Sequence, residues 1–283
     1  MADQLPSASR QHPVLAGAVV LVTGAGRGMG ALYARAAAAA GARVVVLWDV
    51  DRVAAEGVAA RLGAVETAVV DANLADRDAV RSAAAEITER FGGVDVLINN
   101  AGIVRNGPFW EHDQRDIEAI MRVNTLAPMW LTRELLPSMI ADRSRRKRIL
   151  NVASAAGTLA NPNMSVYAAS KWALVGWSES VRLELERSGH RHVKVTTFCP
   201  SYVSTGMFAG ARGPLLTPIM TPERAAAAAW RGMLAGTPLV LRPWTVRLSM
   251  ALRGVLPVRC WDAVAGPVFK VYSSMDEFTG RPR

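Results

Sequence analysis

The sequence predicts an α/β fold in which a mainly parallel sheet of seven strands is doubly wound, with helices on both faces. Two observations lead to this class. Short runs rich in β-branched residues alternate with longer amphipathic or alanine-rich segments, and these runs are apolar throughout rather than at every second position. Such strands are buried on both faces, as in parallel sheets whose crossover connections are helices. Right-handed crossovers then distribute the helices over both faces.

The expected elements follow one another in the order strand, turn, helix. Strands are expected at residues 18–22, 43–48, 65–70, 94–98, 148–152, 193–198 and 238–241. Helices are expected at residues 29–40, 51–62, 76–91, 114–140, 166–187 and 222–234. Residues 206–221 are rich in Gly and Pro, and we expect them to form a mobile loop over the ligand site. In folds of this type ligands bind beyond the carboxyl ends of the strands.

The domain organisation expected from the sequence is simple. No linker rich in Ser, Gly or Pro divides the chain of 283 residues, and α/β folds of about 250 residues often form one domain. We expect residues 1–13 to be a flexible polar tail and residues 14–242 to form the sheet domain. Residues 243–283 are then a helical C-terminal extension packed on that domain.

Several function classes find no support in the sequence. Cys199 and Cys260 lie far apart without a zinc spacing, which indicates a reducing, cytoplasmic compartment rather than a disulfide scaffold. The N-terminal residues lack a secretory leader pattern, and no apolar run is long enough to span a bilayer. No G-x-S-x-G turn supports acyl transfer. No metal site is expected, because the histidines are scattered: His12, His112, His190 and His192.

The basic charge of the chain, +9 with a pI of about 10.3, suits anionic ligands, nucleic acid or an anionic membrane. Most basic residues are spread over the sequence. One dense patch is expected in a surface loop: Arg143, Arg145, Arg146, Lys147 and Arg148. No aromatic residues interleave with it, as they do in single-strand-binding surfaces. We therefore expect no nucleic-acid partner and interpret the patch as solvated surface.

A glycine-rich turn, Thr23-Gly24-Ala25-Gly26-Arg27-Gly28-Met29-Gly30, links the first strand to the first helix. Glycines let backbone N–H groups approach a pyrophosphate closely, and the helix N-terminus adds a favourable dipole. This strand–turn–helix context predicts a Rossmann-like dinucleotide-binding domain over residues 14–242. The cofactor contacts predicted in the turn are Gly24, Gly26, Arg27, Gly28, Met29 and Gly30.

The residue that ends the second strand bears on the identity of the cofactor. Asp49 at that position is suited to accept hydrogen bonds from the adenosine ribose and to repel a 2′-phosphate. Arg27 and Arg52 argue for the opposite preference, because either side chain can pair with a 2′-phosphate. The carboxylate acts at hydrogen-bonding distance in a fixed direction, so we expect NAD rather than NADP.

Motifs along residues 15–241 resemble those of the short-chain dehydrogenase/reductase family. The glycine turn matches the family's T-G-x-x-x-G-x-G form, and Ser201 stands where the family usually has glycine. The remaining matches are Asn99-Asn100-Ala101-Gly102, Asn124, Ser154, Tyr167-x-x-x-Lys171 and Pro200-x-x-Val203-x-Thr205. The resemblance implies an NAD(P)-dependent oxidoreductase that interconverts a small-molecule alcohol and a carbonyl by hydride transfer.

Tyr167 is the expected acid/base of that reaction. It lies one helical turn before Lys171, so both side chains share a helix face. A phenol with a pKa near 10 is a poor base at neutral pH, and lowering that pKa to about 7 requires roughly 4 kcal/mol of differential stabilisation. The Lys171 ammonium and the positive charge of the oxidised nicotinamide are expected to supply it.

Other site roles rest on position or on the resemblance. Ser154 follows the fifth strand and is expected to hold the substrate oxygen near Tyr167, for which Ser165 and Ser170 are less well placed. The resemblance implies that Asn124 holds a water in a proton relay from Lys171. It also implies further cofactor contacts, namely Asp71 and Ala72 (or Asn73 beside them), Asn100, Ala101, Gly102, Tyr167, Lys171, Pro200, Val203 and Thr205.

The C-terminal extension carries two apolar helical stripes, one beginning at Trp244 and the other at Trp261, with arginines beside them. Three interpretations stay open: packing on the domain or on a second subunit, covering the substrate cleft, or peripheral membrane contact through residues 243–275. The ending loosely resembles family members that act on lipid-like alcohols such as steroids or retinoids. The resemblance also implies a homodimer or homotetramer formed through residues 114–140 and 166–187.

Two alternative functions accompany the enzyme hypothesis. A non-catalytic dinucleotide-binding protein explains the glycine turn but leaves the Ser154, Tyr167, Lys171 and Asn124 set without a purpose. A membrane-associated binding protein rests on the C-terminal helices alone. The loops expected around the substrate carry mostly apolar or small residues, which favours an apolar, lipid- or steroid-like substrate.

Overall fold

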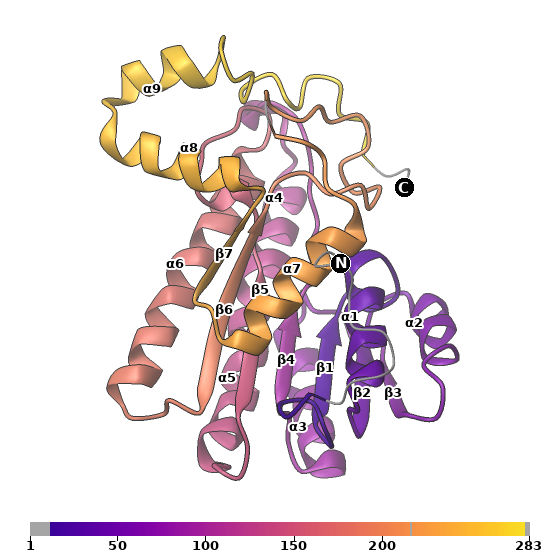
Figure 1. The fold of residues 1–283 in the computed structure, drawn as a ribbon. Coiled ribbons are helices and arrows are strands. Elements are labelled where there is room, and N and C mark those ends of the chain that lie inside the picture. The colour runs from indigo at the N-terminus through magenta and orange to yellow at the C-terminus, as the bar shows by residue number, and fades with distance from the viewer. Residues whose placement is uncertain (1–11, 216, 281–283) are drawn as a thin grey trace.

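The structure is a computed structural model, and it describes residues 12–215 and 217–280. Its centre is a parallel sheet of seven strands in the order β3-β2-β1-β4-β5-β6-β7 (Figure 1). The strands are β1 (Val19–Thr23), β2 (Val44–Trp48), β3 (Glu66–Val70), β4 (Val96–Asn99), β5 (Lys147–Val152), β6 (Val193–Pro200) and β7 (Leu239–Arg242). The predicted doubly wound α/β class is confirmed.

Helices cover both faces of this sheet. One face carries α1 (Gly28–Ala39), α2 (Arg52–Ala59) and α7 (Pro222–Ala235). The other carries α3 (Arg77–Phe91), α4 (Gln114–Met121), α5 (Ala127–Ala141) and α6 (Ser165–Arg187). Beyond the carboxyl edge lie α8 (Trp244–Val255) and α9 (Val258–Ala265). Three short helical segments complete the fold: η1 (Phe109–Glu111), η2 (Arg122–Leu126) and η3 (Ala155–Gly157).

Local sequence signals explain where the helices begin and end. Asp51, Asp76 and Thr221 each accept a hydrogen bond from a backbone N–H in the first turn of α2, α3 and α7, respectively. Gly92 and Gly236 end α3 and α7 in the left-handed conformation, which glycine adopts without a steric penalty. These capping residues therefore set where α2, α3 and α7 begin and where α3 and α7 end.

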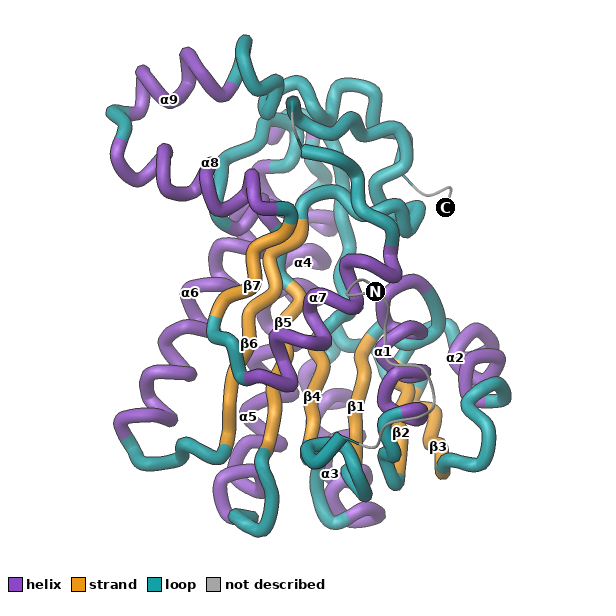
Figure 2. The backbone as a smooth tube through the Cα atoms, in the orientation of Figure 1, coloured by secondary structure: helices purple, strands orange, loops and turns teal. Residues whose placement is uncertain are grey.

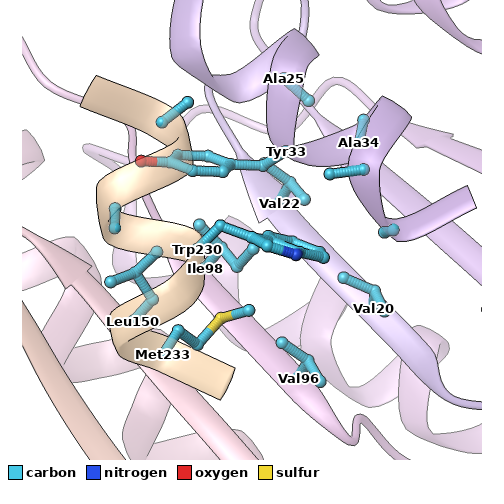
Figure 3. Packing of buried hydrophobic residues seen from close by; sticks show 14 of the residues in the cluster. Val20, Val22, Ala25, Tyr33, Ala34, Val96, Ile98, Leu150, Trp230 and Met233 are labelled. Atoms are coloured by element: carbon cyan, nitrogen blue, oxygen red, sulfur yellow. The ribbon is translucent and has the colours of Figure 1, made fainter. Parts of the chain in front are cut away.

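The core between α1, α7 and the sheet is built around one aromatic pair. The rings of Tyr33 and Trp230 stack with centroids 6.4 Å apart and planes inclined by 14°. Figure 3 shows this pair between the two helices, with Val20 and Ile98 of the sheet beneath Trp230. The alanine run of α7 is buried beside it, so the helix approaches the strands closely. Close packing of this kind holds β1 and β4, whose carboxyl ends face the candidate site.

A buried amide chain crosses the centre of the sheet. The side-chain amide of Asn99 in β4 donates to the side-chain Oδ1 of Asn151 in β5 at 2.8 Å, and the Asn151 amide donates to the Ser178 hydroxyl of α6 at 2.8 Å. Ser178 in turn donates to the Leu174 carbonyl. Each donor has an acceptor, so these buried polar groups hold β4, β5 and α6 in one register without an unpaired N–H.

The expected single helix over residues 114–140 needs correction, because its middle is a π-helical turn, η2. The backbone N–H of Ala127 donates to the Arg122 carbonyl, one residue further back than in an α-helix. Pro128, near the start of α5, has no N–H to donate to the carbonyl of Asn124. The widened turn accommodates the proline and places Asn124 on the inner side, where it is buried.

The basic patch expected on a surface loop is also corrected. Lys147 and Arg148 begin β5 and are buried. Lys147 forms ion pairs with Asp95 and Asp142, and Arg148 donates to the Leu234 carbonyl. Two of the five basic residues therefore serve the sheet rather than the surface. The tail expected over residues 1–13 lies outside the described residues, apart from His12 and Pro13.

The loop expected over the site is tied down by the C-terminal segment. Backbone N–H groups of Arg212 and Leu215 donate to the carbonyls of Ser274 and Phe269 at 2.9 and 2.8 Å, and Thr279 donates to Ala209. Figure 2 shows this segment together with the loops that follow the strands, all beyond one edge of the sheet. The loop is thus bonded to residues 269–280 rather than attached only at its ends.

Two helical glycines make a matched pair that tests the packing of α7 on β7. A Cβ on buried Gly232 would overlap the Val240 side chain, whereas exposed Gly176 in α6 has open space around it. We expect Gly232→Ala to lower the free energy of unfolding by about 1–3 kcal/mol through overpacking. Gly176→Ala should raise it by up to about 1 kcal/mol through helix propensity. Urea denaturation measures both, and equal effects would contradict this packing.

Candidate active site

The glycine turn between β1 and α1 has the shape of a phosphate cradle. Gly28 has a φ of +52°, which favours glycine, and it begins α1, whose first N–H groups face outward. A Cβ on Gly30 would overlap the Gly24 carbonyl, so only glycine lets the helix start against the turn. The positive end of α1 is therefore open to an anion, as pyrophosphate binding requires.

Asp49 braces this turn from the end of β2. Its side chain accepts hydrogen bonds from the backbone N–H groups of Gly26 at 2.8 Å and Asp51 at 3.0 Å. The carboxylate is largely buried and faces the same cavity as the turn. The two arginines that argue for a phosphate are both paired with carboxylates: Arg27 with Asp51 at 2.9 Å, and Arg52 with Glu56 and Asp71.

The segment after β4 is joined to the glycine turn through Thr23. The Thr23 hydroxyl accepts from the N–H groups of Asn100 and Ala101, both at 3.0 Å. The Asn100 amide donates back to the carbonyls of Thr23 at 2.9 Å and Gly24 at 3.2 Å. These bonds hold the ends of β1 and β4 together. The small residues Ala101 and Gly102 then line the cavity beside the glycine turn.

Tyr167 and Lys171 lie on the inner face of α6, where both side chains are buried. The Lys171 Nζ lies 5.7 Å from the centroid of the Tyr167 ring and donates to the Val152 carbonyl at 2.9 Å. Because β5 ends at Val152, this bond fixes the lysine against the edge of the sheet. The phenol and the ammonium therefore share one dry wall of the cavity.

Burial acts on both groups by disfavouring their charged forms. It raises the pKa of Tyr167 above its ordinary value, while a hydrogen bond with Ser154 acts in the opposite direction. It lowers the pKa of Lys171 from 10.5 to about 8. The chain by itself therefore keeps the phenol protonated, which is consistent with the expectation that Lys171 and a second positive charge are both needed to lower this pKa. A further positive charge beside the ring is needed to stabilise the phenolate.

Ser154 follows β5 and begins η3, where its hydroxyl accepts from the Ala156 N–H at 3.1 Å. This bond fixes the orientation of the side chain and leaves its hydroxyl hydrogen available to another acceptor. Ser154 lines the cavity that contains the glycine turn and also the neighbouring apolar cavity. The hydroxyl thus lies at the junction of the two spaces.

Asn124 is held by three hydrogen bonds in the π-helical turn η2. Its amide accepts from the Ile103 N–H at 2.8 Å and donates to the Ile103 carbonyl at 2.9 Å and the Ser170 hydroxyl at 3.0 Å. Both N–H groups of the side-chain amide therefore have acceptors, and its oxygen is bonded to the Ile103 N–H. A Cβ on Gly102 would lie 3.3 Å from the Asn124 Oδ1 and 3.5 Å from the Lys171 Nζ, so these groups flank one glycine.

Most predicted site residues line one cavity of about 340 Å³ along the carboxyl edge. Those that line it are Gly24, Arg27, Gly28, Met29, Asp49, Ala72, Asn100, Ala101, Gly102, Ser154, Tyr167, Lys171, Pro200, Val203 and Thr205. The glycine turn, the Asp49 carboxylate and the buried Tyr167 side chain therefore face one space. Gly26, Gly30 and Asn124 lie behind the wall, where they shape it.

Asp71 is placed differently from the rest of the predicted set. Its side chain is half exposed and forms an ion pair with Arg52, and it does not line the cavity. Ala72, Asn73 and Leu74 line the cavity instead. Ile103, Met207 and Phe208 also line the cavity, and they belong to loops expected near the substrate. Sequence reasoning missed Val50 and Val123. Val50 follows the end of β2 closely, which is a positional signal, whereas Val123 lies in the π-helical turn η2 and had none.

An apolar cavity adjoins the first one through Ser154, Ser201 and Phe208. Its other walls come from the loop after η3, from Pro214, Leu215 and Thr217, from α8 and from the C-terminal segment. The Phe208 ring meets the Tyr167 ring edge to face, with centroids 5.9 Å apart. Tyr202, Asn161 and Ser274 form a hydrogen-bonded group in this wall. The extension thus covers the cleft, one of the interpretations left open by the sequence.

Comparisons with known proteins give one family. The model described as short chain dehydrogenase matches residues 18–214. Epidermal retinol dehydrogenase 2 of Mus musculus is 32% identical over 280 residues, covering 97% of this chain and 89% of that protein. Estradiol 17-beta-dehydrogenase 11 of Rattus norvegicus is 34% identical over 254 residues, covering 88% of this chain and 83% of that protein.

Solved structures agree with this assignment. A short chain dehydrogenase/reductase from Burkholderia phymatum in complex with NAD superposes with a TM-score of 0.77 at 26% identity, covering 85% of this chain and 94% of that one. A metagenomic short-chain oxidoreductase in complex with NADP gives a TM-score of 0.67 at 31% identity, covering 81% and 97%.

The burial of Lys171 predicts a pH dependence of stability. Its pKa is about 8 in the folded chain against an ordinary 10.5, so between these values the unfolded chain binds more protons. The free energy of unfolding should therefore rise with pH over this window, by up to about 1.4 kcal/mol per pH unit, relative to a Lys171→Met variant. Urea denaturation of both proteins at several pH values from 7.5 to 9.5 measures the difference. Parallel profiles would contradict the buried, depressed lysine.

Proposed function

The chain belongs to the short chain dehydrogenase family and is an NAD(P)-dependent oxidoreductase that interconverts an alcohol and a carbonyl, and from this premise we propose its site roles, cofactor and substrate. Tyr167 is the acid/base, NAD is the preferred cofactor, and the substrate is an apolar steroid- or retinoid-like alcohol or carbonyl. The observation that carries the proposal is the buried Tyr167–Lys171 pair, which lies in the wall of the same cavity as the glycine turn and Asp49.

The residues that hold the dinucleotide divide the cavity along its length. The backbone of the glycine turn and the N-terminus of α1 bind the pyrophosphate, and Asp49 accepts from the adenosine ribose. Val203 and Thr205 hold the carboxamide end, while Lys171 also reaches the ribose nearest Tyr167. When bound, the nicotinamide supplies hydride acceptance or donation.

The protein moves the proton that accompanies this hydride. In the direction of oxidation, the Tyr167 phenolate takes the proton of the substrate hydroxyl, while the Ser154 hydroxyl donates to the same oxygen and orients it. The Lys171 ammonium stabilises the phenolate from beneath the ring. Protons leave through a water held at the backbone carbonyl of Asn124. The side-chain amide of this residue is already bonded to Ile103 and Ser170. Reduction follows the same path in reverse.

The preference for NAD rests on how the charges around the ribose are arranged. Asp49 is fixed by Gly26 and Asp51, so its negative charge cannot swing away from a 2′-phosphate. Arg27 lines the cavity but is paired with Asp51, and Arg52 is paired with Glu56 and Asp71. A 2′-phosphate would meet a fixed carboxylate and would have to compete with Asp51 for the Arg27 guanidinium.

The apolar cavity supports the choice of substrate. Its lining includes Leu159, Met164, Leu215 and Phe269, and none of the described residues that line it is charged. The relatives described above are named for retinol and estradiol, alcohols with an extended apolar body. Such a substrate places its hydroxyl at Ser154 and Tyr167 and buries its rings or chain under the loop and the extension.

The working unit is proposed to be a sheet domain of residues 14–242 covered by the extension, assembled as a homodimer or homotetramer through the outer faces of α4–α5 and α6. Leu183 on α6 remains 47% exposed, as a side chain at such a contact would in a single chain. Sedimentation velocity tests the assembly. The alternative of a non-catalytic dinucleotide-binding protein is set aside, since the family members matched are named dehydrogenases.

Removal of the Tyr167 hydroxyl tests the acid/base role. Tyr167→Phe should lower kcat with a secondary alcohol by at least about a thousandfold, because general acid–base catalysis is lost together with the orientation of the substrate oxygen. NAD binding, followed by fluorescence titration, should be unchanged. The matched control is Tyr33→Phe, which removes a buried hydroxyl that has no hydrogen-bond partner among the described residues and does not line the cavity. Retained turnover in Tyr167→Phe would refute the role.

Neutralising Asp49 tests the cofactor preference. Asp49→Asn keeps an oxygen for the Gly26 N–H but removes the negative charge that faces the ribose. The ratio of kcat/KM with NAD to kcat/KM with NADP should fall by at least about tenfold, the equivalent of about 1.4 kcal/mol. The control is Asp78→Asn on the exposed face of α3. An unchanged ratio in Asp49→Asn would show that the carboxylate does not select the cofactor.

A further inference from the structure

The hairpin formed by α8 and α9, residues 244–265, projects from the body of the molecule beyond the sheet (Figure 1). Its outer surface carries large apolar side chains in water. Trp244 is 65% exposed, Val255 is 83% exposed and Val258 is 74% exposed. Val255 and Val258 flank the turn between the two helices, so the tip of the hairpin is apolar. Monomeric proteins rarely leave such side chains together without a partner.

Positive charge predominates around this apolar tip. The hairpin contains three arginines, Arg247, Arg253 and Arg259, and all three are exposed. Arg242, also exposed, lies just before it. Arg253 lies over the Trp172 ring, 4.7 Å from its centroid. The hairpin has one carboxylate, Asp262, which accepts a hydrogen bond from the Tyr272 hydroxyl. The hairpin thus combines exposed apolar side chains with an excess of positive charge.

We propose that this hairpin docks on an anionic lipid surface, with its tip inserted at the level of the headgroups. Apolar side chains on an amphipathic helix enter the boundary between headgroups and acyl chains, while flanking arginines bind the phosphates. Each basic residue near an anionic leaflet strengthens the attachment. Among the described residues no helix meets the length and hydropathy of a bilayer-spanning segment, so the attachment is peripheral.

A second copy of the chain fits this surface less well. A twofold contact brings the same patch of both subunits together, so three arginines of one hairpin would face three of the other, with Asp262 as the one carboxylate of each hairpin. Like charges at an interface core oppose association. An anionic bilayer instead offers negative charge and apolar depth in one surface. Charge complementarity therefore favours lipid.

The hairpin is also connected to the apolar cavity. Trp244 and Leu248 of α8 line that cavity and are themselves exposed. Helix α8 therefore forms the wall of the cavity on one side and part of the proposed docking surface on another. On a bilayer, an apolar substrate can pass from lipid to the cavity along α8 without crossing bulk water. This last consequence rests on the proposed function, whereas the docking itself does not.

Vesicle flotation tests the docking directly. Full-length protein is mixed with vesicles of phosphatidylcholine alone or with about 30% phosphatidylserine, and floated on a density gradient. The wild type should float with the anionic vesicles and remain below with the neutral ones. Val255→Asp/Val258→Asp should lower the partition coefficient at least tenfold. The matched control is Val53→Asp, a valine on α2 that is 79% exposed and distant from the hairpin.

The electrostatic part has its own pair of variants. Arg247→Gln/Arg259→Gln should weaken binding to anionic vesicles at least tenfold, and 1 M salt should have a similar effect on the wild type. The control is Arg35→Gln/Arg61→Gln, which removes the same amount of charge from two exposed positions outside the hairpin. Arg35 lies on α1 and Arg61 follows α2. This variant should bind the vesicles as the wild type does. Circular dichroism and NAD binding show that each variant is folded.

Three outcomes would overturn the proposal. They are failure of the wild type to float with anionic vesicles, equal flotation of the tip variant and the wild type, or a dimer in sedimentation that Val255→Asp/Val258→Asp dissociates. The assay needs no turnover, so it is repeated on Tyr167→Phe. Flotation of Tyr167→Phe with anionic vesicles would support docking even if the proposed reaction is wrong. Loss of turnover in Tyr167→Phe with unchanged flotation would show that docking and catalysis are separate properties.

Discussion

The parallel pairing of β1 with β4, of β4 with β5 and of β5 with β6 brings four strand ends to one edge of the sheet. The residues that follow those ends have to meet there: the glycine turn, Asn100 to Gly102, Ser154 and Pro200. Hydrogen bonds between Thr23 and Asn100, and the buried chain from Asn99 through Asn151 to Ser178, lock the register of that edge. Displacing one of these strands would move the glycine turn after β1 away from Tyr167 on α6.

The same edge is made dry by elements that come late in the chain. Residues 269–280 bond to the loop after β6, and Phe208 of that loop packs against Tyr167. Burial disfavours the charged forms of both Tyr167 and Lys171. A cationic nicotinamide is thus the charge that the cavity lacks, which links protonation of the phenol to the oxidation state of the cofactor. The cover that excludes water also forms the apolar cavity.

Local patterns in the sequence predicted the alternating elements, the glycine turn and the Tyr167–Lys171 pair, because each depends on spacing within a strand or a helix. The π-helical turn at Asn124 was missed, since Pro128 signals a break without giving its geometry. The burial of Lys147 and Arg148 depends on Asp95 and on the Leu234 carbonyl, which are remote in the chain. The bonds between residues 209–215 and 269–280 likewise have no local signature.

The central claim is direct hydride transfer between an apolar alcohol and a nicotinamide in the cavity at this edge. Its most direct test is isotopic: the enzyme is incubated with NAD and steroid or retinoid alcohols deuterated at the carbinol carbon, and the reduced cofactor is analysed by mass spectrometry. The account predicts one deuterium in the NADH formed from each substrate that turns over. NADH without deuterium, or no reduced cofactor with any apolar alcohol of the panel, would contradict it.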